Sequence, residues 1–334
     1  MRWDDLNARV RGMSAHLLGA AAIQSLAAEF DIDALARRLH DGPYDAGLRG
    51  ALPSAISIDQ SVRRAAAARL ATLAKWAGPR IRRLTAIFEE EDRRSVRALL
   101  RGAAAGARPE ARLSGLVPTP ALPESALTEL SRQPTAAKVA ALLVAWGHPF
   151  GSPIFEHAGG DQPDLFLVEL ALAQAFAARA RKSARNAELR RFTQDSIDCE
   201  NASAAVALAG RKLGVASDRV FLHGGRRISK DFFLHVVAAQ DAESAMGRLA
   251  WLDEGRSPFA RGVAGATTES LERALLRFRI VHLKRIARMK PLGPALLLHY
   301  ALRLRAEVMD LRTIAWGLIL RAPRQLINDQ LVTV

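Results

Sequence analysis

The sequence has very few cysteines and few aromatic residues. Cys199 is the single cysteine among 334 residues, so an intrachain disulfide framework is excluded and a reducing compartment is favoured. Aromatic residues make up only 6% of the chain, whereas alanine and leucine are abundant. Because β-branched and aromatic runs are scarce, this composition favours helices over sheets.

Long hydrophobic runs are also missing. The two most apolar windows, residues 139–146 and 295–298, are shorter than the roughly 18 residues that a membrane-spanning helix needs. Residues 1–5 are not a basic segment leading into an apolar one, so no signal peptide is expected. Any association with a membrane is therefore predicted to run through a partner or a surface.

Enzyme signatures are absent as well. The sequence contains no G-x-x-x-x-G-K-[ST], G-x-G-x-x-G, H-E-x-x-H or G-x-S-x-G pattern. The Gly102-x-x-x-Gly106 pair is interpreted as a helix-ending or close-packing pair. His223 and His235 lie in different elements and favour surface or core roles over a metal site. Cys199 is interpreted as a small, half-buried filler, so we predict no catalytic, cofactor-binding or metal-binding residue.

Positive charge is in excess, and a weak pattern recurs. The 48 basic residues against 34 acidic ones give a formal charge of +14, which favours nucleic acid, anionic lipid or an acidic protein as a partner. At three points in the chain an acid is followed three positions later by a polar residue. Counted from the first of these acids, Asp92, the second lies 198 − 92 = 106 positions later and the third 307 − 92 = 215 positions later. The residues of this structural repeat are Asp92, Ser95, Asp198, Asn201, Glu307, Asp310 and Arg312.

The third copy breaks off at the end of the chain, and its missing half is found at the beginning. The spacing of Leu26, Asp31, Leu35 and Leu39 repeats that of later residues. Its counterparts in the first copy are Leu130, Thr135, Val139 and Leu143. A repeat divided in this way predicts that the two ends of the chain meet and that the three copies close into a ring.

We therefore expect one three-lobed domain with an all-α fold. One lobe is closed by both termini (residues 1–83 and 291–334), and the others span residues 84–194 and 195–290. The pairs Pro43-Tyr44, Pro149-Phe150 and Pro258-Phe259 are interpreted as packing anchors that close the lobes. The recurring acids are interpreted as helix caps or partners of local arginines, in preference to three functional sites.

Local patterns predict long helices between the repeat modules. Two helices are expected over residues 6–39, and Ser57 or Asp59 is expected to cap the helical stretch that follows. That stretch, residues 60–88, is interrupted at Gly78-Pro79. Further long helices are expected over residues 164–191 and 269–289.

The motifs together resemble a known family. Asp92-x-x-Ser95-Val96-Arg97, Asp198-x-x-Asn201-Ala202-Ser203 and Glu307-x-x-Asp310-Leu311-Arg312 are similar to a pattern of the C subunit family of the V/A-type rotary ATPases. The eukaryotic V-ATPase counterpart is the d subunit. Asn7-Ala8-Arg9-Val10-Arg11-Gly12-Met13 resembles the family's N-terminal helix. The likeness covers nearly the whole chain, although only the second copy keeps the asparagine and that copy has Ser203 where a basic residue is usual.

The resemblance implies a funnel-shaped, all-helical protein with pseudo-threefold lobes, no catalytic activity and no cofactor. Such a protein is a peripheral part of the central stalk at the cytoplasmic face of the membrane. It sits on the membrane proteolipid ring and holds the rotor shaft in its hollow. Torque then passes between the ATP-hydrolysing head and the ring, in ion transport or ATP synthesis.

One basic stripe is a candidate partner interface. Arg273, Arg277, Lys284 and Arg288 recur at helical spacing. The stripe is either a solvated face or a surface for acidic rotor subunits or anionic headgroups. The alternative function is a stand-alone basic helical-repeat protein that binds nucleic acid or an acidic partner. The sequence shows no aromatic platform or reading motif of a nucleic-acid binder, so the rotor role is preferred and no nucleic acid is expected as a partner.

Overall fold

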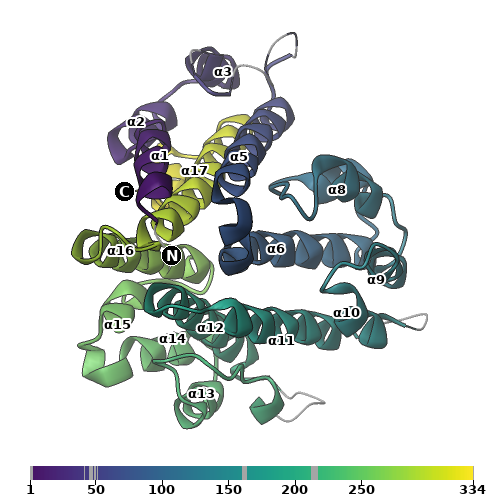
Figure 1. Ribbon diagram of the computed structural model, residues 1–334, viewed down its shortest axis with the longest axis vertical. Helices are drawn as coiled ribbons and strands as arrows, with labels where there is room; N and C mark the ends of the chain where they lie inside the picture. Colours follow the sequence, from purple (N-terminus) through teal and green to yellow (C-terminus); the bar gives the residue numbers. More distant parts are fainter. Residues whose placement is uncertain are drawn as a thin grey trace. The chain divides into compact units, whose positions relative to one another are not determined.

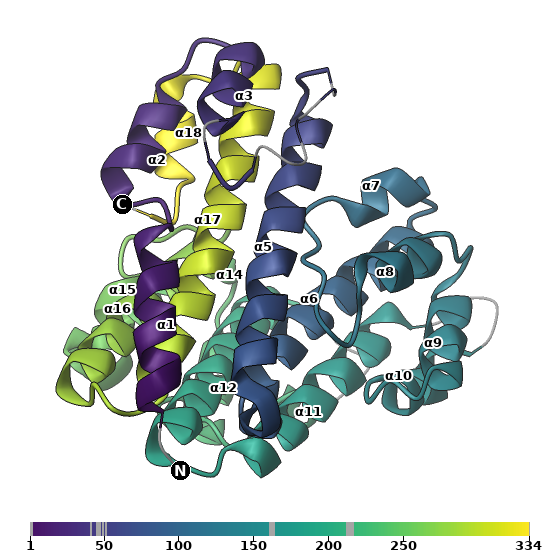
Figure 2. The same ribbon diagram turned by 45° about the horizontal axis from the view of Figure 1, so that its top comes forward.

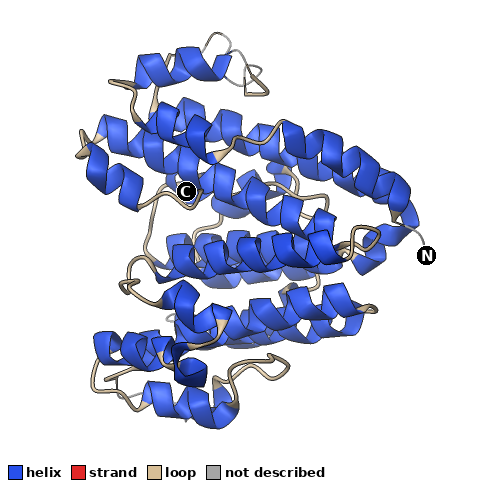
Figure 3. Ribbon diagram, turned by 90° about the vertical axis from the view of Figure 1, so that its left-hand side faces the viewer, coloured by secondary structure: helices blue, strands red, loops and turns tan. Residues whose placement is uncertain are grey.

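The computed structural model describes residues 3–40, 42–44, 48, 50, 52–159, 164–211 and 217–333. Within these ranges the protein consists of helices and connecting loops without strands (Figure 3). The all-α prediction is confirmed. The chain divides into two compact units, and helix α17 (Ala295–Ile319) contributes to both. The three predicted lobes and their boundaries stay a prediction.

The first unit comprises Met1–His16 and Ala184–Ala306. Helix α12 is its centre and contacts α13, α14 and α16, while α15 packs on α16 (Figure 1). The rings of Phe259 and Phe278 meet edge to face at 5.3 Å across the α15–α16 contact. Its elements are α1 (Asp4–Ala15), α12 (Ala187–Leu208), a 3-10 turn (Ser217–Arg219), α13 (Lys230–Val237), α14 (Ala242–Ala250), a second 3-10 turn (Leu252–Gly255), α15 (Pro258–Val263), α16 (Leu271–Met289) and the start of α17.

The second unit comprises Leu17–Ser183 and Glu307–Val334. Helix α6 packs against α11 and α9, and α2 lies against α18 (Figure 2). Its elements are α2 (Ala20–Ala27), α3 (Ile32–His40), α5 (Ala55–Ala77), a 3-10 helix (Gly78–Arg83), α6 (Thr85–Ala104), α7 (Pro109–Leu113), α8 (Glu124–Ser131), α9 (Ala136–Ala145), α10 (Gly151–Ala158), α11 (Leu165–Ser183), the end of α17, and α18 (Arg324–Asp329).

Residues from both ends of the chain share the core of this second unit. Ile23 and Leu35 from its beginning and Ile314 and Leu331 from its end are all fully buried. Because α2 contacts α18, segments nearly three hundred residues apart in sequence pack together. This contact is what a repeat divided between the termini requires.

Short polar side chains set where several helices begin. Thr135 accepts a hydrogen bond from the backbone N–H of Lys138 at the start of α9. Asp241, its counterpart in the second copy, accepts one from Ser244 at the start of α14. Such side chains satisfy backbone donors that have no partner within the helix. A short polar side chain therefore starts both helices, at positions that the predicted repeat aligns.

The predicted cap of α5 was misplaced by a few residues. Ser54 is the N-cap residue, and Ser57 completes a reciprocal capping box with it. Asp59 lies inside the helix and accepts hydrogen bonds from the backbone N–H of Gly115 (3.2 and 3.3 Å). A serine one turn upstream therefore provides the cap, and the aspartate is used for a tertiary contact.

Two of the helix predictions were wrong, because the structure has more helices in those stretches than predicted. Residues 6–39 form three helices, because α1 and α2 are separate. Residues 164–191 are divided between α11 and α12, because Asn186 caps a new helix by accepting from the N–H of Leu189 (2.8 Å). The break at Gly78-Pro79 and the helix over residues 271–289 agree with the sequence.

The Gly102 and Gly106 pair has both of its predicted structural roles. A Cβ atom at Gly102 would lie 2.7 Å from the side chain of Arg112, so this glycine allows close packing. Gly106 ends the helical stretch with a φ of +64°, a conformation that glycine adopts without steric cost. The aromatic residues of the predicted packing anchors, Tyr44, Phe150 and Phe259, are buried.

Candidate functional site

The recurring polar residues are buried inside helices. Each acid and the polar residue three positions later lie in the interior of α6, α12 or α17 and are at most 2% exposed. Of the two interpretations of these acids, the helix-cap one was wrong, because helices start well upstream of each of them, whereas Glu307 and Asp198 do pair with arginines, Arg69 and Arg227. One helical turn separates each pair, so both members face the same side. The six residues are Asp92, Ser95, Asp198, Asn201, Glu307 and Asp310.

In the second copy the pair fixes the chain that returns after α12. The carboxylate of Asp198 accepts hydrogen bonds from the backbone N–H groups of Arg226, Arg227 and Ile228 at 3.0–3.2 Å. The Asn201 amide donates to the carbonyl of Leu222 and accepts from its N–H, both at 2.9 Å. Burial raises the pKa of Asp198 to about 6, although these N–H donors favour its ionised form.

A second buried acid on α12 extends this cluster. Asp195 forms an ion pair with Arg227 and lies 2.6 Å from Nδ1 of His282. Burial raises the pKa of Asp195, but the hydrogen bond from His282 and the charge of Arg227 outweigh it and bring the pKa below its usual value. Arg227 also lies over the ring of Phe278, with its guanidinium carbon 4.9 Å from the ring centroid.

In the third copy Glu307 joins the beginning and the end of the chain. Its carboxylate accepts hydrogen bonds from the backbone N–H of Leu18, the hydroxyl of Tyr44 (2.6 Å) and the guanidinium of Arg69. Burial and the neighbouring carboxylate of Glu307 raise the pKa of the Tyr44 hydroxyl, which therefore stays a donor. The buried charge of Glu307 is thus both paired and hydrogen-bonded, as burial of a carboxylate requires.

Asp310 repeats the role of Asn201. It accepts hydrogen bonds from the backbone N–H groups of Val332 (2.6 Å) and Thr333 (2.9 Å). The separation of 22 positions between Asp310 and Val332 is close to the 21 positions between Asn201 and Leu222. A carboxylate can only accept, so it serves where two N–H groups must be bound.

In the first copy the acid is also linked to a backbone N–H group of the returning chain, but through a different side chain. The hydroxyl of Thr119 donates to Asp92 and accepts from the backbone N–H of Leu122 (3.0 Å). Leu122 aligns with Ile228, whose N–H binds its acid directly. Burial raises the pKa of Asp92, against the hydrogen bonds from His148 and Thr119. A threonine hydroxyl therefore bridges a contact that is direct in the other copies.

The structure explains why Ser95 can stand where the family's pattern has an asparagine. Leu116, which aligns with Leu222, receives a hydrogen bond to its carbonyl from the side chain of Arg63 on α5. In the second copy the amide of Asn201 donates that bond. Because an arginine from another helix supplies the donor, the first copy needs no asparagine on its own helix.

These clusters bind backbone groups and paired side chains. Their carboxylates face N–H donors, a hydroxyl or a guanidinium, and Asp195 and Asp92 also face the imidazoles of His282 and His148. Across the described ranges no group of three or more histidine, cysteine or acidic side chains could hold a metal ion. His223 and His235 are exposed, and Cys199 is buried, deeper than the half-buried position predicted.

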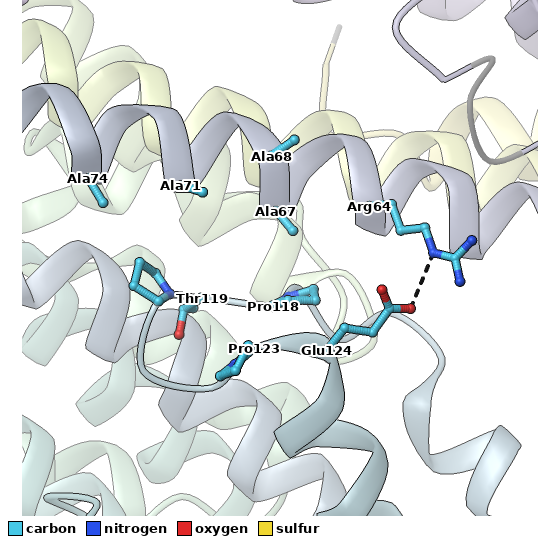
Figure 4. Close-up of a pocket in the computed structure, with 10 residues that line it drawn as sticks. Arg64, Ala67, Ala68, Ala71, Ala74, Pro118, Thr119, Pro123 and Glu124 are labelled. Atoms are coloured by element: carbon cyan, nitrogen blue, oxygen red, sulfur yellow. Dashed lines mark hydrogen bonds and ion pairs between the residues drawn. The ribbon is translucent and has the colours of Figure 1, made fainter.

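The second unit also has a groove, which is more open than the buried acid clusters. It has a volume of about 460 Å³ and lies between α5 and the turn that follows α7 (Figure 4). Alanines of α5 form one wall and prolines of the turn form the other. Arg64 and Glu124 pair across its mouth at 3.3 Å. The lining residues are Arg64, Ala67, Ala68, Ala71, Ala74, Pro118, Thr119, Pro120, Pro123 and Glu124.

The predicted basic stripe lies on α16 but is not uniform. Lys284 and Arg288 are exposed, whereas Arg273 and Arg277 are half-buried. Arg273 donates a hydrogen bond to the carbonyl of Glu269 (3.1 Å), one turn earlier. The second half of the stripe therefore faces solvent more fully than the first half and is better placed to meet a partner.

Sequence reasoning missed several members of the buried clusters. Asp195 lies three positions before Asp198, and Thr119 lies 27 positions after Asp92. The signal for Asp195 was its place on the same helical face as a recurring acid. Leu18 and Arg227 gave no signal, because Leu18 acts through its backbone and Arg227 is one of many arginines.

Comparison with known proteins decides the family. The family model described as ATP synthase (C/AC39) subunit matches residues 6–330. The chain belongs to the ATP synthase C/AC39 subunit family. Comparison with curated proteins gave no match.

Members of the C/AC39 family are subunits of V/A-type ATPases, so this chain associates with other ATPase subunits. The family is a structural one, which fits a subunit without catalytic activity. No helix among the described residues is long and apolar enough to span a membrane. The match gives no support to the alternative of a stand-alone protein that binds nucleic acid or an acidic partner.

Proposed function

We propose that this C/AC39 protein is the socket of the rotor, coupling the central shaft to the proteolipid ring of a V/A-type ATPase. The observation that carries the proposal is the family match over residues 6–330. The protein would sit on the membrane-embedded ring at the cytoplasmic face of the membrane, as a peripheral component. The protein would transmit torque through packed lobes and perform no reaction itself.

The buried acids fit a part that carries mechanical load. In the second and third copies the acid and its neighbour fix other parts of the chain to a long helix through several hydrogen bonds, and in the first copy the hydroxyl of Thr119 does so through one. Buried polar contacts of this kind have little freedom to rearrange, because an unpaired partner would be left without solvent. The third cluster also ties the start of the chain to its end. Such ties would let a lobe move as one body.

The groove beside α5 is the proposed contact for a helix of the shaft. Ala67, Ala71 and Ala74 recur at helical spacing on one side of α5, and small side chains let a second helix approach closely. The prolines of the opposite wall leave no backbone N–H to satisfy at their positions. Arg64 and Glu124 at the mouth could pair with charged residues of an incoming helix.

A binding experiment with shaft subunits tests this assignment. Ala71 is exposed, so Ala71→Trp fills the groove without disturbing the core. We expect it to weaken capture of purified shaft subunits at least tenfold while the circular dichroism spectrum and melting curve stay unchanged. Ala137→Trp, at a half-buried position of α9 outside the groove, is the matched control. Equal capture by wild type and Ala71→Trp would contradict the groove assignment, and no capture by the wild type would contradict the socket role.

A further inference from the structure

The second half of α16 and the turn after it combine exposed cations with exposed apolar side chains. Single exposed apolar residues are normal on a protein surface, but here Val281, Met289 and Leu292, which are 67%, 63% and 70% exposed, fall within twelve positions. They lie among four exposed basic residues. We call this surface the α16 patch: Val281, Lys284, Arg285, Arg288, Met289, Lys290 and Leu292.

Helix α16 itself supplies no negative charge to the patch. The sequence has no acid from Arg273 to Lys290. Lys290 forms an ion pair with Glu188 on α12 at 3.4 Å. Lys284, Arg285 and Arg288 project into solvent from consecutive turns, so their fields add at the surface.

A histidine beneath the patch reports the same positive field. His299 on α17 has its pKa lowered to about 4 by burial and then by the charges of Arg303, Lys284 and Arg288. Its Nε2 atom is buried and has no hydrogen-bond partner among the described residues. The imidazole is therefore neutral at physiological pH, and an anion bound above it would remove part of the repulsion.

The turn that presents Leu292 is held in place. The side-chain amide of Asn7 on α1 donates hydrogen bonds to the carbonyls of Pro291 and Gly293, both at 3.0 Å. These two bonds flank Leu292 on either side. A preorganised turn can present an apolar side chain to a partner with little loss of conformational entropy.

We propose that the α16 patch binds the anionic headgroups of a lipid bilayer directly. Cations that contact phosphate groups beside apolar side chains that enter the headgroup boundary are the features of an interfacial membrane-binding surface. A nucleic acid would use the four cations but would leave Met289 and Leu292 without a role. The proposal goes beyond the rotor socket, in which membrane contact runs through partner subunits, and it holds whether or not the socket role does.

Co-sedimentation of the full-length protein with vesicles tests the proposal. Vesicles of phosphatidylcholine alone are compared with vesicles that also contain phosphatidylglycerol, at low and raised salt. We expect binding only to the anionic vesicles, weakened by salt. Lys284→Glu/Arg288→Glu should lower the affinity at least about tenfold, as expected for loss of several surface contacts. The control Lys138→Glu/Lys182→Glu makes the same change in net charge at exposed lysines elsewhere and should lower it less than about threefold.

A second pair of measurements separates lipid from other anions. Met289→Ser/Leu292→Ser keeps every charge and should weaken vesicle binding severalfold while leaving binding to polyglutamate and duplex DNA unchanged. Anionic vesicles should also raise the pKa of His299, followed by NMR. The proposal is overturned by equal binding to neutral vesicles, by an equal loss in the control pair, or by a wild type that binds polyglutamate or DNA but no vesicle. Vesicle binding that survives both patch variants would overturn it as well.

Discussion

The backbone N–H of Leu18 donates a hydrogen bond to the carboxylate of Glu307, 289 positions away in the sequence. The same relationship joins Ile228 to Asp198, over 30 positions. One contact is therefore local in the second copy and joins the two ends of the chain in the third. The two long helices therefore use a buried acid in the same way although the chain connects differently around them, as the predicted repeat would require.

Removal of Glu307 should strongly destabilise the protein. Glu307→Ala leaves Arg69 and the hydroxyl of Tyr44 buried without their shared acceptor. Loss of one partner of a buried ion pair typically costs about 3–5 kcal/mol. Urea denaturation followed by circular dichroism measures the change in the free energy of unfolding.

The matched control for this experiment is the exposed pair Arg64–Glu124. Glu124→Ala should change the free energy of unfolding by less than about 1 kcal/mol, because solvent screens the pair. Similar effects of Glu307→Ala and Glu124→Ala would mean that the buried cluster does not hold the two ends of the chain together.

A methyl group at Gly225 should push the returning chain off its acid. A Cβ atom there would overlap with Oδ1 of Asp198, inside the ring of N–H donors. Overpacking of this kind costs about 1–3 kcal/mol. Gly247→Ala in the middle of α14 meets no atom within 4 Å and should stabilise by about 0.5–1 kcal/mol. Thermal melts of both variants check the opposite signs, and a neutral Gly225→Ala would refute the geometry.

Asp198 should make the protein less stable as the pH rises from about 4 to about 6. Its pKa is raised from 3.8 to about 6 in the folded protein. Between these values the folded state keeps a proton that the unfolded state releases, so folding is favoured most below 3.8 and loses this contribution as the pH passes 6. Asp198→Asn should remove this slope. Stability curves of wild type and variant that run parallel across this range would exclude the assignment.

His299 should have the opposite dependence over an overlapping range. Its folded pKa of about 4 lies below the ordinary 6.5, so the unfolded state binds the proton first as the pH falls. Stability is then complete above 6.5 and decreases as the pH falls towards 4. His299→Gln should abolish this decrease, measured as the difference in free energy of unfolding between variant and wild type. A difference that does not change with pH would show that His299 is not held neutral.

The sequence was sufficient for the fold class, because its composition favoured helices over sheets. The spacing of Asp92, Asp198 and Glu307 pointed to three long helices that each bury an acid, while the three-lobed repeat stays a prediction. Helix boundaries were harder to predict from the sequence where a single capping residue divides one helical stretch into two helices. Asn186 divides residues 164–191 into two helices, and a single polar residue within a helical pattern seldom shows that on its own.

The roles of the recurring residues could not be obtained from their local sequence. Asp92 and Asp198 look like helix caps because they follow polar segments, yet their hydrogen-bond partners lie 27 to 30 positions later. In sequence, Ser95 is only a departure from the asparagine of the family's pattern. It became interpretable only when Arg63, from another helix, was seen to donate to the carbonyl of Leu116. Tertiary substitution of this kind leaves no signal in a single sequence.

The most direct test of the rotor assignment is affinity purification of the tagged protein from detergent-solubilised membranes, with mass spectrometry of everything that co-purifies. The assignment predicts the shaft, the ATP-hydrolysing head and the proteolipid ring in one complex with ATPase activity. Recovery of the protein alone, or with nucleic acid and no ATPase subunit, would contradict it.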